Sequence, residues 1–384
     1  MSLFHKEESY LGIDIGSQGM KLVELKKNKG RPQLWTYGML NEHLDVHLEY
    51  ANSNLPVQPP DPFADLKAVE TKKDKKPVVA VKDERIVKYG ELLKSLLKTS
   101  RVTTNRATAS LPVSSIFHAI ITLPAIDEKE IDHHIQAKAQ KMLPLPMDQM
   151  QVVHQKIPDA QQNGKMKFIR VLLTAAPRKL VTFYSDIFTY AGLQLQELET
   201  EAFALERALV GRDTATSMII DIGAQHTNFF IVDQGLPITH RTINFGGQNL
   251  DAILQGIFGV DMALTVQMKH DISRLSADRI PLGIFSSAID PILKEIQYGF
   301  DMFLHQTGNE QKRPEKIILT GGSCVFPLFA SVIAQKFPLK VFVGDPWARV
   351  VYQQGLKPVL DEVGPRMASC IGLAMRNILQ DSLA

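Results

Sequence analysis

The sequence predicts an α/β protein of two lobes with related designs, and a smaller α+β module inserted into the first lobe. Three observations lead to this fold class. A glycine-turn hairpin occurs twice, strands alternate with helices after each copy, and a compact run of strands and helices lies between the copies. With 384 residues, of which 45% are hydrophobic, the chain can form two such lobes and bury their cores.

The first copy of the hairpin, Tyr10–Leu25, reads YLGIDIGSQGMKLVEL, and the second, Ser217–Gly235, reads SMIIDIGAQHTNFFIVDQG. In both, apolar strand residues lead into Asp-Ile-Gly-Ser/Ala-Gln, and an alternating strand follows. This pattern predicts a carboxylate and a flexible glycine at each turn. Asp14 and Asp221 lie 207 positions apart. Because that spacing is too long for a solenoid repeat, it indicates two lobes instead.

These patterns predict a division of the chain into four parts. We expect the first-lobe core at 1–116, the inserted module at 117–195, a return to the first lobe at 196–216, and the second lobe at 217–384, with an outer helical part at about 246–299. Within the first lobe, Asn41–Lys88 is rich in proline and lysine. Such a composition cannot form a packed element, so we expect a flexible insertion there.

The first lobe and the module show the following elements. Leucines at helical spacing predict a helix at Tyr89–Lys98, and the strand Ala107–Leu111 follows. Prolines end a strand and stop a helix in the module, and glycine caps its last helix. The expected module elements are strands at Ile116–Leu123, Gln151–Ile157 and Phe168–Ala175, a turn at Asn163-Gly164, and helices at Glu128–Met142 and Arg178–Ala191.

The second lobe continues the alternation of strands and helices after its hairpin. Gly246-Gly247 leads into a helical region, and an apolar strand ends in Thr-Gly-Gly-Ser. The expected elements are helices at Asn249–Arg274, Ser287–Gln306 and Met367–Leu379, and strands at Lys316–Leu319 and Val341–Val343.

Composition narrows the class of protein. Lys and Arg number 43 against 41 Asp and Glu, so no global field indicates a nucleic-acid partner. Met1–Tyr10 is charged, and no run of about 18 apolar residues occurs, so we expect neither a secretory signal nor a membrane span. Cys324 and Cys370 lack CxxC spacing, which favours the reducing cytoplasm. We expect a soluble, cytoplasmic protein that reaches a membrane only through a partner.

The two hairpins are candidate phosphate sites. Successive backbone N–H groups in such a glycine turn can point into one concavity and bind phosphate oxygens. Lys21 returns from the strand as a point charge, and Asp14 and Asp221 are expected to hold Mg²⁺, largely through water. The remaining candidates are Gly16, Ser17, Gln18 and Gly19 in the first hairpin, and Gly223, Ala224, Gln225 and Thr227 in the second.

A third motif, Leu319-Thr320-Gly321-Gly322-Ser323, places two glycines after an apolar strand. A glycine pair lets a nucleoside lie against the backbone, although strand–Gly–Gly–helix is common by itself. Combined with the two hairpins, Gly321, Gly322 and Ser323 become candidates for the adenosine side of a nucleotide site.

The order of these motifs resembles the actin, Hsp70 and sugar-kinase superfamily. Within it, the chain is most similar to the PilM family of type IV pilus assembly proteins, relatives of the division protein FtsA. The resemblance is carried by ATASLPVSSIFHAIITLP, by IDEKEIDHHIQAKAQKMLPLPMDQM with its Pro-x-Pro turn, by LLTAAPRKLVTFYSDIFTYAGLQLQELETEAFAL, and by Arg241–Leu250. It covers almost the whole chain except Asn41–Lys88. It implies an actin-like ATPase fold that binds ATP or ADP with Mg²⁺ between the lobes.

The resemblance also implies partners. PilM-like proteins bind the cytoplasmic N-terminal tail of the membrane protein PilN in a groove between the first lobe and the inserted subdomain, here about Phe117–Leu195. The expected role is a scaffold in a PilM–PilN–PilO–PilP complex at the inner face of the cytoplasmic membrane, linked to pilus motor ATPases. Self-association is a further interaction that the resemblance allows.

Two departures limit what the resemblance implies about chemistry. Many family members have a glutamate at the position of Val266, and together with the lysine matching Lys269 it contacts the ribose. Hydrolysis needs a group that orients water at the γ-phosphate. Glu201 is a candidate, as are Gln225 and His226, but packing or capping explains Glu201 as well. We therefore expect at most weak ATPase activity.

Other classes of protein stay open as alternatives. A small-molecule kinase of the same superfamily would need an aspartate base beside an acceptor pocket, and an FtsA-like filament protein would carry an amphipathic C-terminal tail. A type II secretion scaffold shares the architecture but usually continues into a membrane segment. The sequence contains no P-loop, Rossmann or GxSxG motif at a fitting place, and the adjacent His133 and His134 diverge on a helix, which argues against a metal site.

Overall fold

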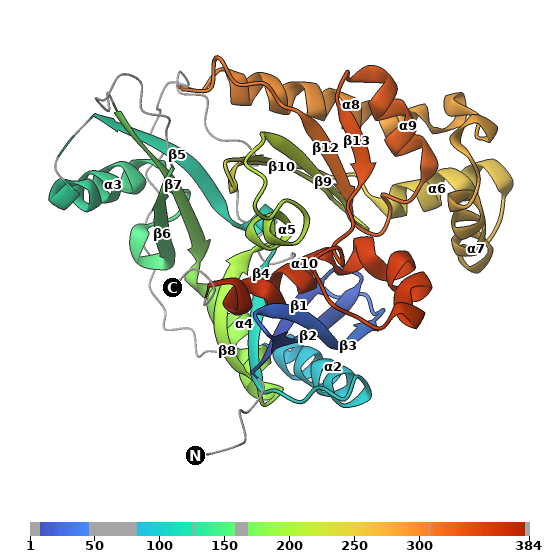
Figure 1. Cartoon of the computed structure of the whole chain (residues 1–384), viewed down its shortest axis with the longest axis horizontal. Helices are drawn as coiled ribbons and strands as arrows, with labels where there is room; N and C mark the ends of the chain where they lie inside the picture. Colours follow the sequence, from blue (N-terminus) through green and yellow to red (C-terminus); the bar gives the residue numbers. More distant parts are fainter. Residues whose placement is uncertain are drawn as a thin grey trace, which may run out of the picture.

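Two five-stranded sheets with the same topology form the two lobes of the computed structural model (Figure 1). The structure describes residues 8–45, 83–124, 126, 128–157, 168–306 and 308–380. The strand order is β3-β2-β1-β4-β8 in one sheet and β11-β10-β9-β12-β13 in the other. In each, three consecutive strands pair antiparallel, and two further strands extend the sheet in parallel. The mixed α/β class is confirmed, and the sequence repeat marks the hairpin that opens each sheet.

The first lobe surrounds its sheet with helices, and its core contains the apolar side chains of the central strands. Its elements are β1 (Ser9–Gly16), β2 (Gly19–Asn28), β3 (Arg31–Leu40), α2 (Glu84–Thr99), β4 (Arg106–Leu111), α4 (Arg178–Tyr190), β8 (Gln194–Thr200) and α5 (Glu201–Leu209).

The second lobe has the larger core, between its sheet and the long helix α8. Its elements are β9 (Ser217–Ile222), β10 (Thr227–Asp233), β11 (Leu236–Ile243), α6 (Gly247–Phe258), α7 (Met262–Ser273), α8 (Leu282–Leu304), β12 (Lys316–Thr320), α9 (Pro327–Lys336) and β13 (Lys340–Val343). The last helix, α10 (Lys357–Gln380), follows them in the chain but packs on the first lobe.

The inserted subdomain is smaller than expected. Its sheet, β5-β7-β6, is covered by one helix, and its elements are β5 (Phe117–Pro124), α3 (Glu128–Met142), β6 (Met150–Lys156) and β7 (Phe168–Pro177). The expected boundary at Leu195 is wrong. The apolar face of α4, with Leu180 and Tyr184, packs into the first-lobe core, and β8 pairs with β4 in the first-lobe sheet. The subdomain therefore ends at Pro177.

Several helix boundaries differ from the expected ones, because capping residues set where those helices begin and end. The helix α2 begins five residues before the expected Tyr89, because the Asp83 side chain accepts the N–H of Arg85 and caps it. The expected single helix in the second lobe divides into α6 and α7, because Gly259 ends α6 at a φ of 64° and Asp261 caps α7. Most of the expected insertion (46–82) and the turn at Asn163-Gly164 lie outside the described residues.

Two helices join the lobes, so 217–384 is not one lobe. Although α10 follows the second sheet in the chain, it packs against β1, where a Cβ on Gly12 would lie 2.1 Å from the Cys370 oxygen. It also crosses α5 closely, since a Cβ on Gly372 would lie 1.8 Å from the Ala204 oxygen. Figure 1 shows α5 and α10 between the two sheets. Both cysteines, one of them on α10, are buried and free, as expected.

No single helix in the described parts of the chain has the length and hydropathy of a membrane span; α6 and α7 reach that level only as a pair bent by 105°.

The small subdomain also packs against the second lobe. The buried Arg170 on β7 donates to Asn309 Oδ1 at 2.9 Å, and the ring of His118 on β5 lies 5.4 Å from that of His240 on β11. Burial, and then the neighbouring ring, lowers the pKa of His118 to about 3. Burial, and then Arg241, lowers the pKa of His240 to about 4. Both rings are therefore neutral at pH 7.

This histidine pair predicts a loss of stability in mild acid. In the unfolded chain both rings take up protons near pH 6.5, whereas the folded chain resists protonation, so stability falls as the pH drops below about 6.5. Between pH 7.5 and 5, we expect the free energy of unfolding of wild type to fall by at least about 2 kcal/mol more than that of the double variant His118→Gln/His240→Gln. Urea unfolding at each pH measures this. The exposed pair on α3, replaced as His133→Gln/His134→Gln, is the control; equal slopes for wild type and the His118/His240 variant would contradict the prediction.

Candidate nucleotide site

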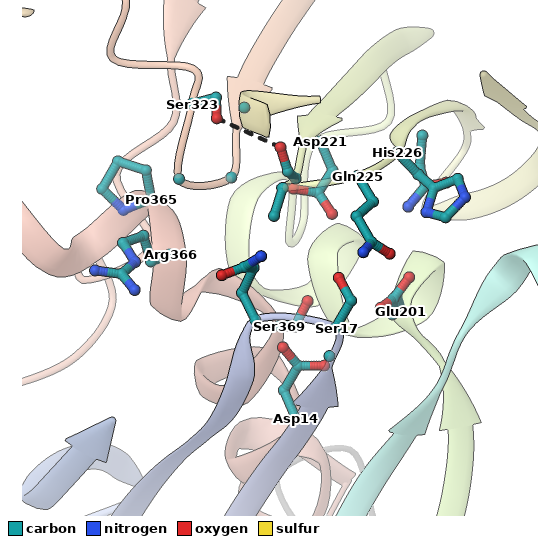
Figure 2. Close-up of a pocket in the computed structure, with 18 of the residues that line it drawn as sticks. Asp14, Ser17, Glu201, Asp221, Gln225, His226, Ser323, Pro365, Arg366 and Ser369 are labelled. Carbon is teal, nitrogen blue, oxygen red and sulfur yellow. Dashed lines mark hydrogen bonds between the residues drawn. The ribbon is translucent and has the colours of Figure 1, made fainter. Parts of the chain in front are cut away.

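A cavity of about 510 Å³ opens between the two lobes, a size typical of small-molecule sites. Both hairpin turns and the Gly321 turn line it (Figure 2). Thirteen of the residues expected at a nucleotide site line this cavity: Asp14, Gly16, Ser17, Gln18, Lys21, Asp221, Gly223, Ala224, Gln225, Lys269, Gly321, Gly322 and Ser323. Glu201, His226 and Val266 line it as well.

Two expected residues do not line the cavity. Gly19 has a φ of 122° and lies against the chain after β3, where a Cβ would meet the Leu40 oxygen at 1.8 Å. Thr227 is fully buried, and its hydroxyl donates to the Phe245 oxygen at 2.7 Å. Both residues build the hairpins and do not line the cavity. The alternating pattern of a strand could not distinguish these roles, because the turn geometry decides which groups face inward.

The first hairpin brings a carboxylate and an ammonium group together. Lys21 Nζ donates to Asp14 Oδ2 at 2.9 Å, and the Ser110 hydroxyl on β4 donates to Asp14 Oδ1 at 2.8 Å. Burial by itself raises the pKa of Asp14, but Lys21 and the hydroxyl outweigh burial and hold this pKa below its usual value. Burial opposes the charge of Lys21, yet Asp14 raises the pKa of Lys21 above its usual value. Both groups are therefore charged at pH 7.

The second hairpin and α5 add two carboxyl groups. Burial raises the pKa of Asp221 to about 6, with Lys21 opposing and Asp14 adding to the shift. Burial and the charges of Asp14 and Asp221 raise the pKa of Glu201 well above its usual value. Figure 2 shows Asp14 and Asp221 on opposite sides of the cavity, with Glu201 to one side. These carboxyl groups face one cavity, but the described residues contain no cluster of three acidic, histidine or cysteine side chains that could hold a metal ion directly, so a Mg²⁺ ion here would keep much of its water shell.

The Gly321 turn packs directly on the second hairpin. Gly321 has a φ of 89°, and a Cβ there would lie 2.4 Å from Asp221 Oδ1. Its N–H donates to the Pro365 oxygen at 3.0 Å, and the Ser323 N–H donates to the Ile222 oxygen at 3.1 Å. Only glycine allows this close approach of the backbone to the carboxylate, so the expected backbone-lined surface is present.

The amino end of α6 forms a further wall that the sequence did not predict in detail. The N–H groups of Gly247 and Gln248 donate to the oxygens of Gly223 and Ala224, each at 2.9 Å. A Cβ on Gly247 would lie 2.3 Å from the Ser323 hydroxyl. The Gly246-Gly247 pair was the only signal for this wall in the sequence. Because these N–H groups already donate to the second hairpin, the amino end of α6 contributes its positive dipole to the cavity wall but not these two donors.

On the side of the cavity where adenosine is expected, the charged side chains form an ion pair and a hydrogen bond with neighbouring residues. Lys269 Nζ lies 2.5 Å from Asp251 Oδ1, while Val266 nearby is 53% exposed. The Arg366 guanidinium on α10 donates to Asn41 Oδ1 at 2.9 Å. Asp251, Arg366 and Asn41 all line the cavity, but they follow no motif, and only the tertiary structure brings them to it.

The residues present fit a magnesium nucleotide on two observations. Both hairpin turns and the Gly321 turn line one cavity, with close backbone packing at glycines 247 and 321, and Asp14 and Asp221 supply carboxylate oxygens, the ligands that Mg²⁺ prefers. Asp14 and Asp221 would hold the metal, and the turn N–H groups with Lys21 would hold the phosphates.

Two solved structures share the fold of this chain. A structure titled "PilM-PilN type IV pilus biogenesis complex" matches with a TM-score of 0.70 and 20% identity, over 96% of this chain and 98% of that chain. The ethanolamine utilization protein EutJ from Carboxydothermus hydrogenoformans matches with a TM-score of 0.51 and 13% identity, over 96% of this chain and 89% of its own. The fold and the cleft therefore define a protein with the actin-like ATPase fold.

A family model narrows this class. The model described as "Type IV pilus assembly protein PilM" matches residues 67–378, well over half of the chain. The chain belongs to this PilM family. The match begins after the first hairpin, so the assignment of Asp14 and Lys21 to the site rests on the geometry described above.

Proposed function

We propose that the chain binds ATP or ADP with Mg²⁺ in the cavity between its lobes. One observation carries the proposal: Asp14 and Lys21 from one lobe line the same cavity as Asp221 and the Gly321 turn from the other. A bound triphosphate would be held from both sides, so nucleotide would favour a closed cleft. Bound Mg²⁺ supplies charge neutralisation of the phosphates; the chain supplies the N–H groups and the lysine.

The site favours a switch over an enzyme with rapid turnover. Glu201 is the carboxyl group placed beside both aspartates, but burial and the charges of those aspartates raise its pKa well above the usual value, which disfavours the carboxylate form that a base for activating water requires. Val266 offers no polar contact to a ribose. The test of binding is calorimetry: ADP with Mg²⁺ should give a saturable isotherm of one site per chain, weakened by EDTA. A flat titration with folded protein would contradict the proposal.

The proposed role is a cytoplasmic scaffold of the type IV pilus inner-membrane complex. Membership of the PilM family and a fold shared with a protein solved in a PilM–PilN complex support this role. The chain would bind the N-terminal tail of a PilN-like membrane protein between its first lobe and the subdomain at 117–177, and so reach the membrane through that partner. Contacts with pilus motor ATPases and self-association belong to the same proposal.

We expect a synthetic peptide of the N-terminal tail of the PilN-like protein from the same genome to bind with one site per chain. Because nucleotide closes the cleft and the groove adjoins one lobe, saturating MgATP should change the peptide affinity by about fivefold or more. Calorimetry with and without MgATP measures both effects, and a scrambled peptide is the control. Equal binding of tail and scrambled peptides would contradict the scaffold role and leave the nucleotide site untouched.

A further inference from the structure

The tip of the β2–β3 hairpin is a second surface with a distinct chemistry. The strand β2 begins at Gly19, in the turn that adjoins the cavity, and ends at Asn28, nine residues away. At about 3.3 Å per residue, the tip lies roughly 30 Å from the cavity. A ligand at this tip would therefore leave both the cavity and its nucleotide accessible.

The tip concentrates positive charge. Lys26, Lys27, Lys29 and Arg31 fall within six residues, whereas the whole chain has a formal net charge of only +2, so the rest of the chain is net acidic. Lys29 and Arg31 are exposed, and the described residues offer neither of them a carboxylate partner. Among the described residues, the tip is thus a local cationic site on a chain whose overall charge is close to zero.

The cationic side chains of the tip lie in and beside an ordered two-residue turn. Lys29 and Gly30 have φ values of 48° and 78°, as in the two-residue turns whose twist matches a hairpin, and Asn28 pairs with Arg31 across it. The Asn28 side chain donates to Gln33 Oε1 at 2.8 Å. Because the turn is already ordered, its charges are presented without the entropic cost of ordering a loop.

An exposed tryptophan adjoins these cations. Trp35 is 51% exposed, and Lys26 Nζ lies 3.4 Å from its ring centroid. Trp35 is the extra residue of a β-bulge, since Leu34 pairs with Leu25 and Thr36 pairs with Glu24. Such a bulge re-aims a side chain away from the ladder. Beside it, Val351 is 43% exposed and exchanges backbone hydrogen bonds with β3.

We propose that this tip binds an anionic phospholipid surface. Clustered lysines and arginines bind anionic headgroups, and an exposed indole prefers the boundary between headgroups and acyl chains. A nucleic acid would require a cationic stripe or groove along which its backbone could run, whereas these cations lie on a short convex turn. The contact would orient the chain on the membrane in addition to any protein partner.

The experiment is co-sedimentation of the full chain with vesicles of phosphatidylcholine, with and without 30% phosphatidylglycerol. Each cation removed should weaken binding about fivefold, so Lys29→Asn/Arg31→Gln should bind anionic vesicles about 25-fold more weakly. Asparagine is chosen because it tolerates the positive φ of position 29. The matched control, Arg274→Gln/Lys336→Gln, removes two exposed cations elsewhere and should bind like wild type.

Further outcomes decide the proposal. Trp35→Ala should weaken vesicle binding while its thermal midpoint stays near that of wild type, and 0.5 M NaCl should release most of the protein because surface charges are screened. Absence of binding to anionic vesicles, or equal loss in the control variant, would overturn the proposal. Tighter binding to a DNA duplex than to vesicles at the same salt would also overturn it, in favour of a nucleic-acid surface. Vesicles contain no protein, so none of these results depends on the PilN-like partner.

Discussion

Replacing Lys21 with methionine is expected to weaken binding of MgATP or MgADP about 100-fold. The ammonium group is the cation placed by the first hairpin beside both aspartates, and a charge-assisted contact to phosphate contributes about 1.5–3 kcal/mol. Methionine keeps the apolar stem but leaves two aspartates and the phosphates without that charge. Calorimetry or a fluorescent nucleotide analogue measures the loss.

The buried position of Lys21 requires a folding control. Lys21→Met leaves Asp14 buried without its partner, so the variant is expected to unfold at a lower temperature. The double variant Asp14→Asn/Lys21→Met removes both charges and should recover stability while still binding nucleotide weakly. Lys336→Met, at an exposed position on α9, should bind like wild type. A folded double variant that bound nucleotide within threefold of wild type would exclude the cavity as the phosphate site.

Replacing Gly372 with alanine is expected to destabilise the chain by about 3 kcal/mol or more. The added Cβ would lie 1.8 Å from the backbone oxygen of Ala204, so α5 and α10 would have to separate. These two helices connect the lobes, and Arg207 on α5 donates to the Gly372 oxygen at 2.7 Å at the same crossing. Urea unfolding followed by circular dichroism measures the change.

A second helical glycine provides the matched control for this prediction. Gly256 in α6 has no neighbour within 4 Å of its added Cβ, so Gly256→Ala should leave stability unchanged or raise it by up to about 1 kcal/mol. If both alanine variants unfold at the wild-type urea midpoint, the close crossing of α5 and α10 does not hold the lobes together.

Local patterns were enough to predict much of the site. The repeated Asp-Ile-Gly turn and the Gly321-Gly322 pair each lie on a strand end, and the parallel pair of β9 and β12 brings the second turn and the glycine pair to one edge of their sheet. The first turn belongs to the other sheet, and the packing of the two lobes brings it to the same cavity. The expected residues in these turns therefore meet in one cavity. Gly19 and Thr227 do not line the cavity, and sequence spacing could not show this, because it does not show which group of a turn faces inward.

Residues without a motif could not be predicted. Asn41 and Arg366 are 325 positions apart, yet they hydrogen-bond at the edge of the cavity. Likewise, the apolar stripe of α4, which includes Leu180 and Tyr184, could pack equally well against the sheet of the small subdomain or the sheet of the first lobe. Periodicity indicates that a helix has an apolar face, but it carries no information about which sheet that face covers.

The sequence by itself determined the α/β class, the two hairpins and the turns that line the cavity, because φ-permissive glycines and strand alternation act over a few residues. Tertiary structure alone decided that α10 returns to the first lobe and that the subdomain ends at Pro177. It also decided that Asp221 and Glu201 lie close enough to Asp14 for its charge to raise the pKa of both. Those outcomes depend on burial and on contacts between distant segments, and both arise only when the chain packs.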